Sequence, residues 1–314
     1  MKVTQNRIAF VFPGQGSQFV GMGWDLYEMY PGARAAFEEA DQVLDFPLSR
    51  LCFQGPENLL NDTVNAQPAI IATSFACLRV LEERKGRVSL WPAVVAGHSL
   101  GEYTALIAGG SLGFAEALKL GRERGRLMKE AGEEIPGGMA AIIGLPDETL
   151  EEVCQEASQG EEMVQVANFN SPGQTVISGE RKALERAMNL AKERGARRVI
   201  PLSVSIAGHS PLMQPAAERF AEFIAQQDFK SARIPLVANV TAQPITAVDD
   251  IKTELVEQLT SPVQWVRSIE YMIRAGIETF IEIGPQKVLS GLIKRIDGQV
   301  KTFSLGDVSS FESL

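Results

Sequence analysis

A serine framed by two glycines, in Gly97-His98-Ser99-Leu100-Gly101, is the segment of this chain that most directly suggests chemistry. An apolar run at residues 93–96 precedes it, and a helix-prone stretch at 102–108 follows it. A Gly-x-Ser-x-Gly sequence between a strand and a helix is typical of a nucleophile elbow, a strained turn whose flanking positions must be small. The turn places Ser99 at a helix N-terminus, where free N–H groups favour negative charge. A glycine-flanked turn without chemistry is the alternative, but the flanking elements favour a catalytic nucleophile.

A serine hydroxyl is a weak nucleophile and needs a base within hydrogen-bond reach. The chain has two histidines, His98 and His209. His98 is inside the elbow, where a neighbouring side chain usually points away from the serine. His209 lies in the loop at 205–211, and loops at strand ends carry the bases of many α/β enzymes. We therefore predict that His209 is the base rather than a structural histidine. No acidic residue is near it in sequence, so a third group comes from elsewhere or a backbone carbonyl holds the ring.

Arg124 suggests a charged substrate. On a helical wheel of residues 114–131, it is the one charged side chain in the apolar half, between Gly121 and Met128. A guanidinium on a buried face needs an anionic partner. This partner is either a buried carboxylate of the protein or a substrate carboxylate held by the planar fork. We expect Gly121 and Gly125 to leave room for a ligand beside it.

A glycine-rich loop, Gly14-Gln15-Gly16, follows an apolar run at 8–12 that is predicted to be a buried strand. Such a loop can donate a backbone N–H to an oxyanion hole, whose other N–H comes from the residue after the nucleophile, here Leu100. A dinucleotide fingerprint is excluded because Phe19 stands where a third small residue belongs. There is no Walker A sequence, and no set of side chains has metal-ligand spacing.

The composition is that of a globular protein with 314 residues, 45% of them hydrophobic and 22% charged. A net charge of −9 argues against nucleic acid as a partner. No apolar run approaches the ~18–20 residues that span a bilayer, and residues 1–7 lack the apolar region of a signal peptide. Three widely spaced cysteines, Cys52, Cys77 and Cys154, are expected to be reduced. We therefore expect a cytoplasmic protein without membrane contact.

Strands alternating with helices predict an α/β domain with a mostly parallel sheet. Residues 134–204 differ, because their predicted elements follow the order β-α-β-β-α-β of a ferredoxin-like unit. The predicted strands of this unit are at 138–143, 163–169, 175–178 and 198–203, and its helices are at 147–157 and 181–194. We expect a large domain of residues 1–133 and 205–314, with nucleophile elbow, and an inserted ferredoxin-like α+β subdomain of residues 134–204.

Taken together, the motifs make the chain resemble the malonyl-CoA:acyl carrier protein transacylases of bacterial-type fatty acid synthesis, and the related acyltransferase domains of polyketide synthases. The match covers nearly the whole chain. The matching segments, in order, are Phe12-Pro13-Gly14-Gln15-Gly16-Ser17-Gln18, Gln67-Pro68-Ala69, Gly97-His98-Ser99-Leu100-Gly101-Glu102, Arg124-Gly125, Asn168-Phe169-Asn170-Ser171-Pro172-Gly173-Gln174, Gly208-His209, Pro262-Val263-Gln264-Trp265 and Glu282-Ile283-Gly284-Pro285.

The resemblance implies a hydrolase-like α/β domain with an inserted ferredoxin-like subdomain. It also implies a catalytic pair in which Ser99 carries the acyl group as an ester and His209 acts first as base and then as acid for the departing thiol. Arg124 is implied to hold the free carboxylate of the malonyl group.

The resemblance assigns five further residues. Gln15 and Leu100 are implied to supply the oxyanion N–H groups. The main-chain carbonyl of Gln264 is implied to hold His209, which accounts for the missing acidic residue. Asn168 and Asn170 are implied to line the cleft between the subdomains.

The implied reaction is a ping-pong transfer of malonyl from malonyl-CoA to the phosphopantetheine thiol of acyl carrier protein, without a metal or bound cofactor. A monomer is expected. Carrier proteins of this pathway are acidic, so the basic cluster of Arg194, Arg197 and Arg198 is a candidate docking surface. Two alternatives stay open: a trans-acting polyketide synthase acyltransferase that takes malonyl- or methylmalonyl-CoA, and a serine esterase on the same elbow.

Overall fold

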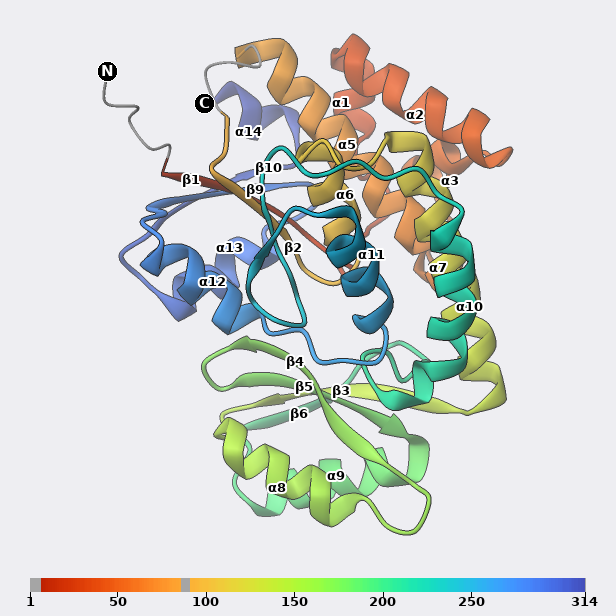
Figure 1. The fold of residues 1–314 in the computed structure, drawn as a ribbon, viewed down its shortest axis with the longest axis vertical. Helices are drawn as coiled ribbons and strands as arrows, with labels where there is room; N and C mark the ends of the chain where they lie inside the picture. The colour runs from red at the N-terminus through yellow and green to blue at the C-terminus, as the bar shows by residue number, and fades with distance from the viewer. Residues whose placement is uncertain (1–6, 86–90, 314) are drawn as a thin grey trace.

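The protein contains two β-sheets, which Figure 1 shows one above the other. The structure, a computed structural model, describes residues 7–85 and 91–313. The larger sheet has six strands in the order β10-β9-β1-β2-β7-β8, and the smaller has four in the order β4-β5-β3-β6. The strands of the larger sheet are β1 (Ile8–Phe12), β2 (Val94–Gly97), β7 (Leu236–Val237), β8 (Pro244–Ile245), β9 (Thr279–Ile283) and β10 (Lys301–Leu305).

The larger sheet is parallel except at one edge. β1 pairs in parallel with β2 and β9, β9 with β10, and β2 with β7. Only β8, at the edge, is antiparallel to its neighbour β7. The prediction of an α/β fold with a mostly parallel sheet is therefore confirmed.

Helices cover both faces of the larger sheet (Figure 1). They are α1 (Trp24–Met29), α2 (Pro31–Leu44), α3 (Leu48–Gln54), α4 (Glu57–Asn61), α5 (Thr63–Lys85), α6 (Gly101–Ala108), α7 (Phe114–Glu134), α10 (Gln214–Ala225), α11 (Val248–Glu257), α12 (Trp265–Arg274), α13 (Val288–Ile296) and α14 (Val308–Glu312), with a short 3-10 turn at Pro211–Met213.

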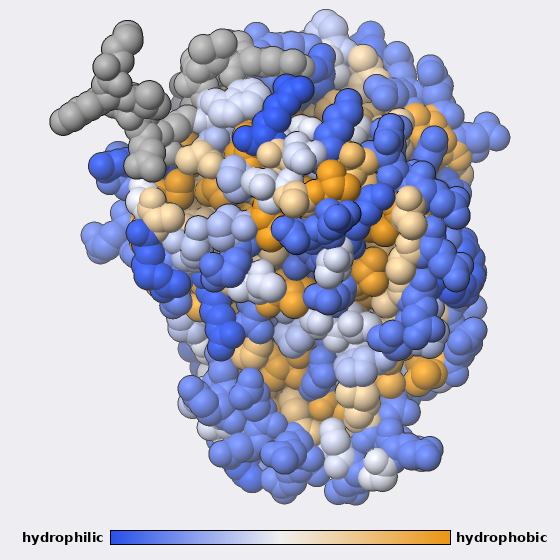
Figure 2. Space-filling view, in the orientation of Figure 1, coloured by the Kyte–Doolittle hydropathy of each residue, from blue (hydrophilic) through white to orange (hydrophobic). Residues whose placement is uncertain are grey.

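The alternation of side chains along β1 shows how the two faces are buried. Phe10 and Phe12 belong to the core formed with α5, α6 and α7. Ala9 and Val11 point to the other face and join the core formed with α12 and α13. Because successive strand residues point to opposite faces, a strand buried on both sides is apolar at every position, as the sequence of β1 is. The surface in Figure 2 is largely hydrophilic, with apolar side chains exposed in separate patches.

Helices α5 and α7 pack closely, and two glycines make the approach possible. A Cβ at Gly121 would lie 2.6 Å from Cδ1 of Ile71, and one at Gly125 would lie 2.5 Å from the carbonyl oxygen of Thr63. The prediction that these glycines leave room for a ligand is therefore wrong, because α5 fills the space.

We expected no segment long and apolar enough to span a membrane, but by length and composition the segment Thr63–Arg84 could cross one. In the structure, 78% of its most apolar window is buried inside the protein.

The smaller sheet is formed by a continuous stretch of chain. Its elements are β3 (Gly137–Ile143), α8 (Asp147–Ala157), β4 (Val164–Ser171), β5 (Gln174–Glu180), α9 (Arg181–Glu193) and β6 (Arg198–Pro201). All strand pairs are antiparallel, and α8 and α9 cover the side of the sheet that faces away from the larger domain (Figure 1). The ferredoxin-like element order is confirmed. We propose that the inserted subdomain spans residues 134–204, as the sequence suggests.

Candidate active site

The turn after β2 has the geometry of a nucleophile elbow. Ser99 has a φ of 50°, in the left-handed region that a non-glycine residue rarely adopts. A Cβ at Gly97 would collide with the backbone of Gly101, and a Cβ at Gly101 would collide with the carbonyl of Phe12. The requirement for small residues on both sides of the serine is thus met by steric contact between β2, the start of α6 and the end of β1.

Ser99 and His209 meet although they are 110 residues apart. The Oγ of Ser99 lies 2.8 Å from Nε2 of His209. The other ring nitrogen, Nδ1, lies 2.7 Å from the main-chain oxygen of Gln258. Because a carbonyl can only accept, Nδ1 carries the proton and Nε2 is left to accept from the serine. His98 points elsewhere: its Nε2 lies 2.7 Å from Oδ1 of Asn170.

The predicted role of Gln264 is wrong. Its N–H donates to the carbonyl of Asn239 at 2.8 Å, and its own carbonyl accepts the N–H of Ser268 at 2.9 Å. Gln264 is the residue before α12, so its carbonyl is used in the first turn of that helix. Gln258 instead stands at the C-terminal end of α11, where helix carbonyls lack partners within the helix. His209 takes one of these free carbonyls.

Arg124 is 2% exposed and all of its hydrogen-bond acceptors are neutral. Its Nη1 donates to Oε1 of Gln67 at 3.0 Å. Its Nη2 donates to Oε1 of Gln258 at 2.9 Å and to Oγ of Ser99 at 3.1 Å. The Nε atom has no partner. Burial lowers the pKa of Arg124, yet a guanidinium keeps its proton in proteins. The described residues therefore hold a buried cation beside the serine and form no ion pair with it.

A network of buried polar groups fixes these side chains from behind. Glu102 is fully buried, and its Oε1 accepts the main-chain and side-chain N–H groups of Asn239, each at 2.8 Å. Oδ1 of Asn239 accepts the N–H of Ser99 at 2.6 Å. The side-chain amide of Gln258 donates to Oε2 of Glu102 and to the carbonyl of Ser99. Burial, and next the charge of Glu254, raise the pKa of Glu102.

Sequence reasoning assigned no role to several members of this network. They are Gln67, Glu102, Asn239, Glu254 and Gln258. Glu102 carried a signal, because it is the one charged residue of an otherwise uncharged helix, α6. The others did not, since a lone Asn or Gln in a sequence gives no indication of what it will bind.

Replacing Gln258 by leucine is expected to weaken both folding and activity. The substitution keeps the main-chain carbonyl that holds His209 but leaves Glu102 and Arg124 each without one partner. An unsatisfied buried polar group costs ~1–3 kcal/mol, so we expect the free energy of unfolding, measured in urea, to fall by about 2–4 kcal/mol. Gln264→Leu is the matched control and should change it by less than about 1 kcal/mol, because its side chain joins no hydrogen bond of the site. Equal losses in both variants would contradict the assignment.

The two N–H groups predicted for an oxyanion hole are free. Leu100 precedes α6 as its N-cap residue, and Gln15 stands in the loop after β1, with its side chain accepting from Oγ1 of Thr63 at 3.0 Å. In the described part of the chain neither main-chain N–H donates to another backbone group. Leu100 is part of the elbow and Gln15 stands in the neighbouring loop, so both N–H groups are available to a ligand.

These groups surround a cavity of about 280 Å³ between the two subdomains. Gln15, Ser99, Arg124 and His209 line it from the larger domain, and Met139, Asn168 and Leu202 line it from the smaller one or its connection. Among residues 7–85 and 91–313 there is no cluster of three or more side chains that could hold a metal ion.

A β-bulge in β4 turns the two predicted asparagines toward this cleft. Val164 and Val166 pack into the core under α8 and α9, so strict alternation would send Asn168 there as well. The register shifts between Val166 and Asn168, and Phe169 packs into that core instead. Asn168 lines the cavity, and Asn170 reaches His98.

The predicted basic cluster lies on the smaller subdomain. Arg194 forms ion pairs with Glu156 at 2.7 Å and Glu152 at 3.5 Å, both on α8. The charge of Arg194 is therefore used within the subdomain, whereas no ion pair joins Arg197 or Arg198 to a carboxylate of the described residues, and docking at this cluster stays a prediction.

Comparisons with known proteins identify the family of the chain. Residues 9–303 match the acyl transferase domain family. The chain is 48% identical over 307 residues to the malonyl CoA-acyl carrier protein transacylase of Bacillus subtilis, covering 98% of this chain and 96% of that protein. It is 45% identical over 304 residues to the Escherichia coli protein of the same name, with 97% of each covered.

A solved structure shows the same architecture. The acyl carrier protein S-malonyltransferase of Vibrio cholerae is 46% identical and superimposes with a TM-score of 0.92, covering 98% of this chain and 99% of that one. The chain therefore belongs to the acyl transferase domain family and, within it, to the malonyl CoA-acyl carrier protein transacylases.

Proposed function

We propose that the protein transfers the malonyl group from malonyl-CoA to the phosphopantetheine thiol of acyl carrier protein, for fatty acid biosynthesis, through an ester on Ser99. The observation that carries the proposal is Nη2 of Arg124, which lies 3.1 Å from Oγ of Ser99, while the guanidinium forms no ion pair with a carboxylate of the described residues. A buried cation needs an anion. Malonyl has its free carboxylate one methylene away from the thioester carbonyl, so an acid held at Arg124 brings that carbonyl to Ser99.

The first half-reaction forms the malonyl ester. Oγ of Ser99 attacks the thioester carbonyl while Nε2 of His209 takes its proton. The N–H groups of Leu100 and Gln15 stabilise the oxyanion of the tetrahedral intermediate. The intermediate then expels the thiolate of coenzyme A, which receives the proton from His209.

The second half-reaction reverses these roles with a different thiol. The phosphopantetheine thiol of the carrier protein gives its proton to His209 and attacks the ester carbonyl. Ser99 leaves as the alcohol and recovers the proton. An esterase for neutral esters would gain nothing from the buried cation at Arg124, so the geometry favours the transacylase over that alternative.

His209 is in the neutral form that a general base requires. Burial, and next the positive charge of Arg124, lower the pKa of His209 to about 3. The ring is therefore neutral near pH 7, with Nε2 free. Gln258 orients the ring of His209 through its main-chain carbonyl. This carbonyl carries no net charge, so it favours the protonated ring less strongly than a carboxylate would.

The pH dependence of malonyl-enzyme formation follows from this pKa. We expect the acidic limb of kcat/KM to lie at least one pH unit below the ordinary histidine value of about 6.5. Once malonyl is bound, its carboxylate offsets the charge of Arg124, which raises the pKa of His209. The acidic limb of kcat should therefore lie at higher pH than that of kcat/KM. Rapid-quench mass measurement with malonyl-CoA between pH 4 and 8 checks this: a kcat/KM limb that lies below this range leaves kcat/KM constant across it, and a kcat/KM limb at or above pH 6.5 would contradict the argument.

Replacing Arg124 by alanine tests the proposal directly. Because a charge-assisted contact to the malonyl carboxylate is lost, we expect kcat/KM for malonyl-CoA to fall about 10²–10³-fold. The value for acetyl-CoA, which has no such carboxylate, should change less than about tenfold. Competition between the two thioesters, read as acyl-enzyme mass, measures the change in preference.

Two further variants control this experiment. Arg124→Met keeps most of the side-chain volume and should show the same loss of preference. Arg126 is a cation on the same helix, and it pairs with Glu123 and Glu130. Arg126→Ala should therefore leave the preference for malonyl unchanged. If Arg124→Ala still prefers malonyl, the carboxylate is held elsewhere.

We propose that this reaction takes place in the cytoplasm. The three cysteines, Cys52, Cys77 and Cys154, are free and buried, as expected in a reducing compartment.

A further inference from the structure

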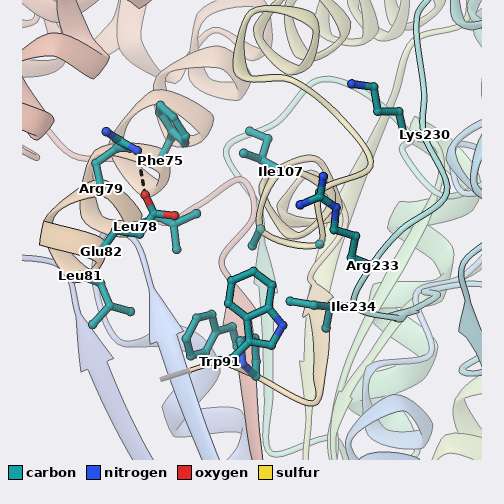
Figure 3. Close-up of a pocket in the computed structure, with 15 residues that line it drawn as sticks. Phe75, Leu78, Arg79, Leu81, Glu82, Trp91, Ile107, Lys230, Arg233 and Ile234 are labelled. Carbon is teal, nitrogen blue, oxygen red and sulfur yellow. Dashed lines mark hydrogen bonds and ion pairs between the residues drawn. The ribbon is translucent and has the colours of Figure 1, made fainter. Parts of the chain in front are cut away.

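A second cavity, of about 300 Å³, lies at the other end of β2 from Ser99 (Figure 3). Trp91 and Pro92 line it just before β2, and Ile107 and Ala108 line it at the end of α6. β2 has four residues and α6 has eight, so each element is about 12–13 Å long and separates this cavity from Ser99 by about that length. This cavity and the catalytic one share no lining residue. It is therefore a separate site.

The floor of this cavity is apolar. Phe10 of β1, Leu78 of α5 and Ile234 are buried, and Ile107 and Phe75 also line the cavity. Trp91 stands at the mouth with 44% of its surface exposed. Apolar surface of this kind gains free energy when a hydrocarbon chain displaces water from it.

The mouth carries cations on two sides (Figure 3). On one side Arg79 pairs with Glu82 at 2.7 Å. On the other side Lys230 and Arg233 are exposed, and no ion pair joins either to a carboxylate of the described chain. In a protein with a net charge of −9, two unpaired cations next to an apolar cavity favour an anionic ligand.

The backbone that carries these two cations is fixed to the end of α6. The N–H of Arg233 donates to the carbonyl of Gly109 at 2.8 Å, and the N–H of Lys230 donates to that of Ser111 at 2.9 Å. Oγ of Ser111 donates back to the carbonyl of Lys230 at 2.6 Å. The backbone positions from which the two cations extend are thus set before any ligand binds, so only their side chains have to be ordered on binding.

We propose that this cavity binds a linear amphipathic anion, with its hydrocarbon chain on the apolar floor and its carboxylate at Arg233 and Lys230. This site goes beyond the proposed transacylase reaction and does not depend on it. The chemistry of the cavity selects both parts of the ligand: a short polar acid would leave the floor in contact with water, and an uncharged chain would leave the two cations unpaired.

Decanoate, used below the concentration at which it forms micelles, tests the proposal. We expect one saturable site by calorimetry, with a change in Trp91 fluorescence, and we expect decanol to bind at least about tenfold more weakly because it lacks the charge. Saturating malonyl-CoA on the Ser99→Ala variant should not displace decanoate. Equal binding of decanol, displacement by malonyl-CoA, or no saturable binding would overturn the proposal.

Variants locate the site. Arg233→Met combined with Lys230→Met should weaken decanoate binding at least about tenfold while leaving malonyl transfer unchanged, which also shows that the protein folds. Lys119→Met removes an exposed cation from α7 and should leave the affinity unchanged. Trp91→Phe should remove the fluorescence change but not the heat of binding. Unchanged affinity in the double variant would place the ligand elsewhere. If the double variant fails to fold, the comparison of decanoate with decanol on the unsubstituted protein still tests the proposal.

Discussion

Ser99→Ala is expected to abolish formation of the malonyl-enzyme. The hydroxyl at 2.8 Å from Nε2 of His209 is the oxygen that we propose forms the ester. Without it, the oxyanion N–H groups and Arg124 can bind malonyl-CoA but have no acceptor for the acyl group. Loss of a nucleophile of this kind costs about 10⁶-fold in kcat. The measurement is the intact mass of the protein after brief exposure to malonyl-CoA, followed by addition of the carrier protein, which should discharge the unsubstituted enzyme.

Ser203→Ala is the matched control for this experiment. Ser203 lines the same cavity, so the two variants differ in whether the lost hydroxyl has the His209 ring beside it. We expect the full malonyl mass shift in Ser203→Ala. A malonyl adduct on Ser99→Ala would refute the assignment of the nucleophile.

The elbow could be predicted from sequence because its determinants are local. A strand, a tight turn and a helix occupy about fifteen consecutive residues, and Gly97 and Gly101 mark the positions where the backbones of neighbouring segments touch. The inserted subdomain could be predicted for the same reason, since its six elements follow one another without interruption. The contact of Ser99 with His209 could be predicted because the chain has only two histidines.

The residues that hold Ser99, His209 and Arg124 in place could not be predicted in this way. Gln258 and Gln264 are six residues apart and chemically identical, and only the end of α11 and the start of α12 decide which carbonyl is free. The role of Gly121 and Gly125 depends on α5, which precedes them by some fifty residues and fills the space beside them. These features depend on contacts between segments that are distant in the sequence, and the periodicity of apolar residues carries no information about such contacts.

His209→Ala is expected to lower kcat for malonyl transfer about 10⁴–10⁶-fold. The hydroxyl of Ser99 would then have to lose its proton to water, and the departing thiolate of coenzyme A would receive none from the enzyme. Because hydroxide can partly replace the base, the residual rate should rise with pH across the range in which the unsubstituted enzyme is constant. Single-turnover mass measurement with malonyl-CoA gives both the rate and its pH dependence.

Two comparisons separate a chemical role of His209 from a structural one. Added imidazole should restore part of the rate of His209→Ala, since the removed ring leaves space next to a cavity of about 280 Å³ and the free carbonyl of Gln258 can orient a new ring. His98→Ala is the matched control: its ring bonds Asn170 instead of the serine, so the loss should stay below about tenfold and imidazole should have no effect. A larger loss in His98→Ala than in His209→Ala would transfer the role of base to the histidine inside the elbow.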